Sequence, residues 1–100
     1  RKLLTMGKLD RLSESGARRG LAAALAAQGK PAEAASEYTK SARIEGNPLA
    51  ADDWLQAALA HLRAGNRPEA IQALQALLEK APRSQAAAEA RVRLKELQAL

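Results

Sequence analysis

Two short stretches decide the fold: GKPAEA, from Gly29 to Ala34, and GNRPEA, from Gly65 to Ala70. Each of them joins one segment rich in alanine and leucine to another. Glycine ends a helix well because it adopts the left-handed conformation without steric cost. Proline suits the first turn of the next helix, where its missing N–H is not needed, and glutamate there favours the helix dipole. Each stretch therefore predicts a tight turn between two antiparallel helices.

The segments around these turns repeat with the same spacing. The two glycines lie 36 residues apart, which is within the range of helical repeat arrays. Apolar or small residues recur three and four positions apart, so they fall on one face of each predicted helix. In the second copy this face comprises Trp54, Ala57, Ala58 and His61, followed after the turn by Ala70, Leu74 and Leu77 or Leu78. We expect Leu74 to be a core residue between the paired helices.

The pattern resembles the tetratricopeptide family, whose repeat reads Trp-x2-Leu-Gly-x2-Tyr, then Ala-x3-Phe, then Pro. The second copy matches it mostly with smaller residues: Trp54, Ala57, Ala58, His61, Ala70, Leu74 and Pro82. The first copy is weaker and offers Leu21, Ala22, Leu25, Ala34 and Tyr38, while Arg18 replaces the tryptophan and Gly46 the proline. It is also two residues longer than the family's repeat of 34.

The resemblance implies an all-α fold, a right-handed superhelix of antiparallel helix pairs with about five to six helices. We expect an N-terminal helix that is a remnant of a preceding repeat, two tetratricopeptide-like repeats, and a polar-faced capping helix. These units are placed at residues 1–14, 15–47, 48–82 and 83–100. Asn47 and Pro48 are expected to start the Trp54 helix as N-cap and first turn, and Ser84 to cap the last helix.

The composition excludes several classes of site. Cysteine is absent, which rules out disulfides and thiolate metal sites. The net charge of +5 permits an acidic partner, but acidic residues are interspersed among the basic ones. No apolar run is long enough to span a membrane. The chain also lacks an initiator methionine, so we expect a fragment, and any anchor or address would lie upstream.

No catalytic residue, metal site, cofactor or small-molecule substrate is predicted. His61 is the single histidine and occupies the tyrosine slot of the repeat, where packing or hydrogen bonding is expected. Asp52 and Asp53 fall in the first turns of a helix, where carboxylates favour the dipole. No glycine-rich phosphate loop follows a strand, and the serines lack a nucleophile motif.

The resemblance implies that the first helix of each repeat lines a concave groove that binds partners. The groove residues expected here are Arg19, Ala23, Leu55, Leu59, Leu62 and Arg63. The three leucines form a second apolar stripe, about 115° around the helix from Trp54 and Ala58, and we expect it to be partly exposed. Either a partner peptide or helix covers this stripe, or the chain's own helices and missing repeats do. Self-association stays open as well.

The function predicted is therefore that of a protein–protein interaction scaffold. The alternative is a nucleic-acid-binding module acting through basic residues such as Arg91, Arg93 and Lys95, which no aromatic side chain accompanies. The stretch from Ala81 to Leu94 resembles bacterial envelope tetratricopeptide proteins, which serve in outer-membrane assembly, cell division or secretion. This resemblance leaves the bacterial cytoplasm and periplasm both open as the compartment.

Overall fold

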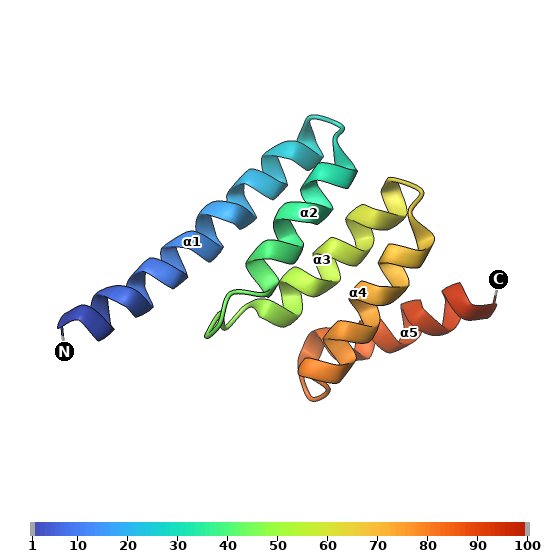
Figure 1. Cartoon of the computed structure of the whole chain (residues 1–100). Coiled ribbons are helices and arrows are strands. Elements are labelled where there is room, and N and C mark those ends of the chain that lie inside the picture. The colour runs from blue at the N-terminus through green and yellow to red at the C-terminus, as the bar shows by residue number, and fades with distance from the viewer. Residues whose placement is uncertain (1, 100) are drawn as a thin grey trace.

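Five helices joined by short turns make up the fold. The computed structural model describes the backbone of residues 2–99 and the side chains of residues 10–99. The helices are α1 (Lys2–Ala27), α2 (Pro31–Ala42), α3 (Ala50–Arg63), α4 (Arg67–Lys80) and α5 (Gln85–Ala99), and the described part contains no strand. The first four run antiparallel to their neighbours, and α5 crosses beside α4 (Figure 1). The expected all-α array of helix pairs is confirmed.

The turns follow the punctuation of the sequence. Gly29 has φ of 77° and Gly65 has φ of 80°, so both take the left-handed conformation that ends a helix. Pro31 opens α2, and Pro68 is the second residue of α4. The last helix begins after Ser84, whose Oγ accepts a hydrogen bond from the amide N of Ala87 at 3.2 Å. These features of the prediction are confirmed.

The end of α1 and the beginning of α3 differ from the prediction. The helix expected to end near residue 14 continues to Ala27, and the Ser15 hydroxyl donates to the Leu12 carbonyl of the same helix (2.9 Å). In α3 the N-cap position is Leu49, and Asn47 lies before it. The Asn47 amide instead bonds across the fold, and its Oδ1 accepts from the amide N of Leu49 at 2.9 Å.

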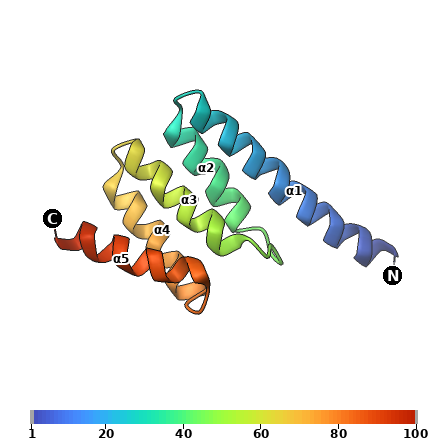
Figure 2. The same cartoon turned by 180° about the vertical axis from the view of Figure 1, so that it is seen from behind.

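Because α1 has 26 residues and α2 has 12, α1 is about 39 Å long and α2 about 18 Å. The N-terminal part of α1 therefore extends past the helix pair, as two opposite views show (Figure 2). The molecule is correspondingly flat and elongated, at 51 × 32 × 17 Å.

The core is thin and built largely of alanine. One cluster joins α3, α4 and α5 with the end of α2, and it contains Leu74 and Leu77, both fully buried. A second cluster joins Ala34 and Ala35 of α2 to Ala60 of α3, with side chains of α1 packed against it. Alanine allows helix axes to approach closely, so few large side chains are needed. Leu74 is a core residue, as predicted.

Candidate partner-binding surface

Helix α3 carries most of the residues expected to line a groove. Leu55, expected to be partly exposed, is only 8% exposed and belongs to the larger core cluster. That expectation of exposure is wrong, because α5 packs against α3 as well as α4 and its Ala86, Ala87 and Ala90 are buried in the same cluster. Helix α5 of the same chain therefore covers the Leu55 end of the leucine stripe.

The stripe becomes more accessible toward the C-terminal end of α3. Leu59 is half-buried and packs against the larger cluster. Leu62 is also half-buried but belongs to neither core cluster. Arg63, the last residue of the helix, is exposed, and the described residues offer it no ion-pair partner. An apolar side chain thus lies beside a free cation at the end of α3.

The two residues expected from α1 lie in different environments. Ala23 is exposed on the helix surface. The guanidinium of Arg19 faces α3 and forms a bidentate ion pair with Asp53, Nε to Oδ1 at 2.8 Å and Nη2 to Oδ2 at 2.9 Å. Its side chain is 29% exposed. A partner that used Arg19 would therefore approach a guanidinium whose two donors already hold α1 to α3.

Asp53 is the centre of a buried polar cluster that sequence reasoning missed. It is 1% exposed, and its Oδ2 also accepts from Ser41 Oγ at 2.6 Å and from Asn47 Nδ2 at 2.9 Å. Burial by itself raises the pKa of Asp53, but the hydrogen bonds from Arg19, Ser41 and Asn47 outweigh it and lower the pKa. Asp53 is therefore an ionised carboxylate whose hydrogen bonds join α3 to α1, to α2 and to the loop before α3.

The signal for this cluster was present but ambiguous. Asp53 does lie in the first turn of α3, as expected for a carboxylate that favours the helix dipole. Its partners, however, come from positions 19, 41 and 47, which only the tertiary fold brings together. With every oxygen of the carboxylate occupied, this cluster stabilises the packing of the helices and offers no free group for chemistry.

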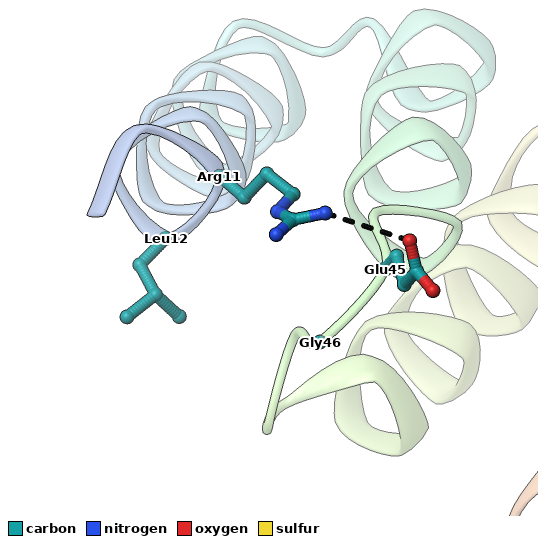
Figure 3. A pocket seen from close by; sticks show the side chains of 4 residues that line it. All are labelled: Arg11, Leu12, Glu45 and Gly46. Carbon is teal, nitrogen blue, oxygen red and sulfur yellow. Dashed lines mark hydrogen bonds and ion pairs between the residues drawn. The ribbon is translucent and has the colours of Figure 1, made fainter. Parts of the chain in front are cut away.

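A shallow hollow lies where α1 meets the α2–α3 loop (Figure 3). Arg11 reaches across it, with Nη1 3.5 Å from Glu45 Oε1, while Leu12 points away from the pair. Both charged side chains are largely exposed, at 51% and 90%, so the pair is screened by solvent and contributes about 0–1 kcal/mol. The hollow holds no buried polar side chain that would mark a binding site.

The basic residues of α5 are partly engaged with the chain itself. Arg93 Nε pairs with Glu89 Oε2 at 3.3 Å, and Arg91 Nη2 donates to the Pro82 carbonyl at 2.8 Å. Lys95 is exposed. A phosphate-binding stripe needs several unengaged cations on one face, so these contacts do not favour the nucleic-acid alternative.

Within residues 2–99, no helix combines the length and the apolar character that crossing a membrane requires. In that same part of the chain, no three His, Cys, Asp or Glu residues converge in a way that could hold a metal ion.

Comparison with known protein families finds one match within this chain. Residues 51–94 match the family model described as tetratricopeptide repeat. This segment is similar to a tetratricopeptide repeat. The match spans α3, α4 and the larger part of α5, which are the helices that share the larger core cluster. Neither the curated proteins nor the solved structures that were searched contain a match.

The first helix pair lies outside the matched segment, and its likeness to the repeat rests on the fold. Its turn has the same left-handed glycine followed by a helix-opening proline as the turn within the repeat. Tetratricopeptide repeats are typically scaffolds for protein–protein interaction, and the match over residues 51–94 suggests this general function for the chain. Which surface binds, and what it binds, is the subject of the proposal below.

Proposed function

We propose that the chain binds a peptide or helix of a partner protein at the C-terminal end of α3, through Leu59, Leu62 and Arg63. The observation that carries this proposal is the position of Leu62, which stays half-buried outside both core clusters although five helices pack together. An apolar side chain left partly in water favours binding, because covering it is worth roughly 1.5–3 kcal/mol for complete burial.

The charge beside this leucine suggests the chemistry of the partner. Arg63 is exposed and has no ion-pair partner among the described residues. A partner segment that presents an apolar side chain to Leu62 and a carboxylate to Arg63 fits both features. Ala23 is exposed on α1 and stays a proposed part of the same binding groove. Bacterial envelope assemblies remain the proposed setting, supported only by the resemblance of residues 81–94.

The test uses a photo-cross-linking residue in place of Gln56, which is exposed on α3 about one turn before Leu59, to capture partners, followed by binding measurements with the captured protein. We expect Leu62→Glu to weaken this binding by about 10- to 100-fold while the variant stays helical and folded. Val92→Glu is the matched control, since Val92 is 57% exposed on α5 and lies outside the proposed surface. Equal binding by both variants would refute the proposed surface.

Salt dependence separates this function from the nucleic-acid alternative. Apolar docking with one ion pair should lose little affinity as salt rises, whereas binding through several phosphate contacts falls steeply with salt. A titration of the captured partner between low and physiological salt therefore distinguishes the two classes. A steep fall, together with release of the partner by nuclease, would support the alternative.

A further inference from the structure

A cleft separates α2 from α4 on the side of α3 that carries Trp54. Both helices pack on α3 and make few contacts with each other, so part of α3 forms the floor between them. The cleft has a volume of about 200 Å³. Its lining includes Arg43 at the end of α2, Trp54 and His61 on α3, and Glu69 on α4. None of these residues belongs to the surface proposed above.

Two buried nitrogen atoms of this cleft lack a hydrogen-bond partner. They are Nε1 of Trp54, a residue only 5% exposed, and Nδ1 of His61. Buried polar atoms are nearly always paired in folded proteins, so each exception calls for an explanation. Both exceptions found among the described residues line the same cleft. This coincidence marks the floor of the cleft as a surface prepared for hydrogen bonding.

The cleft is also polarised along α3. The Arg43 guanidinium carbon lies 5.8 Å from the centre of the Trp54 ring, so a cation and an indole N–H occupy one end. Glu69 lies close enough to His61 to oppose the lowering of its pKa by burial. Burial keeps His61 neutral, with one nitrogen free to accept. Trp54 and His61 are two helical turns apart, so donors and acceptors are about 10 Å from each other.

We propose that this cleft binds a peptide segment of a partner protein that carries a carboxylate and, about 10 Å away, a primary ammonium group. The carboxylate accepts from Trp54 Nε1–H and from Arg43. The ammonium donates to His61 Nδ1 and pairs with Glu69. Entry at the Trp54 end requires Arg43 to swing from the indole ring onto the carboxylate, since Nε1 lies beneath the surface. Arg43 is exposed and has no ion pair within the described part of the chain, so it is free to move.

Triglycine is a suitable probe, because its charged termini lie about 10 Å apart when the peptide is extended. The chain has one tryptophan and one histidine, so the indole N–H and imidazole signals in NMR spectra are unambiguous reporters. We expect triglycine to shift both signals saturably. N-acetyl-triglycine and triglycine amide, which each lack one charge, should bind about tenfold more weakly.

Matched variants assign each charge to its side chain. Arg43→Ala should bind triglycine and its amide equally, and Glu69→Gln should no longer distinguish triglycine from its acetylated form. Arg83→Ala, an exposed residue outside the cleft, should bind like the unaltered chain. All three substitutions are at exposed positions, so the fold should persist, which circular dichroism checks.

Two outcomes would overturn the proposal. In the first, triglycine leaves the Trp54 indole signal unmoved at every concentration up to its solubility. In the second, triglycine, its acetylated form and its amide shift the signal equally. If this holds in the unaltered chain, in Arg43→Ala and in Glu69→Gln, the peptides touch the cleft but neither of their charges is recognised. Neither outcome bears on the leucine surface of α3, whose test uses other residues and another partner.

Discussion

Asp53 shows how a single residue can fix the relation of three helices. A carboxylate that is 1% exposed is unfavourable unless it is paired and hydrogen-bonded. Here Arg19 supplies two charge-assisted bonds from α1, Ser41 supplies one from α2, and Asn47 supplies one from the following loop. Because each donor comes from a different element, the cluster specifies the register of α1 and α2 against α3, which a core of alanines specifies poorly.

Arg19→Ala tests the importance of this cluster for stability. The substitution leaves Asp53 buried without its cation, and breaking a buried pair in this way costs about 3–5 kcal/mol. Arg18→Ala is the matched control one position away, because it leaves Glu37, which is 14% exposed, still paired with Lys40 and should therefore cost less than Arg19→Ala. Urea unfolding at pH 7 measures both. A loss for Arg19→Ala no larger than that for Arg18→Ala would contradict the assigned role.

The stability of the chain should fall in two stages as the pH is lowered. Burial lowers the pKa of His61 below its ordinary value of 6.5, although Glu69 opposes the shift, so the unfolded chain takes up a proton first. The free energy of unfolding is therefore greatest above pH 6.5 and decreases as the pH falls through the lower pKa of the folded state. The second decrease, at still lower pH, begins with Glu37, whose pKa lies below its ordinary 4.5, and continues with Asp53 below its ordinary 3.8.

His61→Gln separates these stages, because glutamine does not titrate. We expect the variant to lose the first decrease and to keep the one below pH 4.5. Unfolding midpoints in urea, measured from pH 8 downward, provide the test. A first decrease that persists in His61→Gln would have to come from another group.

For single residues, the sequence predicted the place in the helix better than it predicted the surrounding side chains. Asp53 was expected in the first turn of α3 and lies there, and His61 was expected to pack within the repeat. The burial of Asp53 and the unpaired Nδ1 of His61 depend on side chains distant in sequence. Periodicity along one helix carries no information about such contacts, so they could not be predicted.

At the scale of elements, a helix end was predictable where the sequence places a glycine that takes the left-handed conformation, and two other helix boundaries were not predictable. The left-handed glycines at 29 and 65 require a conformation that other residues adopt only with strain, so their meaning is local. The start of α3 and the length of α1 had no such signal. Ser15 and Asn47 are both good capping residues, but each bonds elsewhere in the folded chain.

Gly29→Ala should destabilise the chain by about 1–2 kcal/mol, because alanine at a φ of 77° is strained. Gly20→Ala is the matched control within α1, where an added methyl group meets nothing within 4 Å and alanine favours the helix. That variant should gain about 0.5–1 kcal/mol. Chemical unfolding of the two variants beside the unaltered chain gives the signs, and the same sign for both would contradict the left-handed turn.

At the scale of the whole molecule, alanine-rich helices stack into a thin array whose larger side chains are concentrated at one end. Leu74 and Leu77 are fully buried within the repeat, whereas the α1–α2 part of the core rests mainly on alanine and on the Asp53 cluster. The order of the helices was predictable from the two turns. How α5 covers Leu55 was not, because that contact depends on the angle at which α5 crosses the pair, which no local pattern encodes.

Leu74→Ala tests whether this concentration of large side chains stabilises the whole array. Leu74 is 0% exposed at the centre of the larger cluster, and removing a fully buried leucine side chain costs about 2–5 kcal/mol, depending on how far the cavity collapses. Leu21→Ala is the control, because Leu21 is 49% exposed on α1 and its loss should change stability by about 0.5 kcal/mol or less.

Urea unfolding followed by circular dichroism measures the loss across all helices, and the fluorescence of Trp54 reports on the repeat alone. If the array is one cooperative unit, the two signals shift together in Leu74→Ala. A transition of Trp54 fluorescence that precedes the remaining loss of helical signal would show that α1 and α2 stay folded while the repeat, with Asp53 in α3, unfolds.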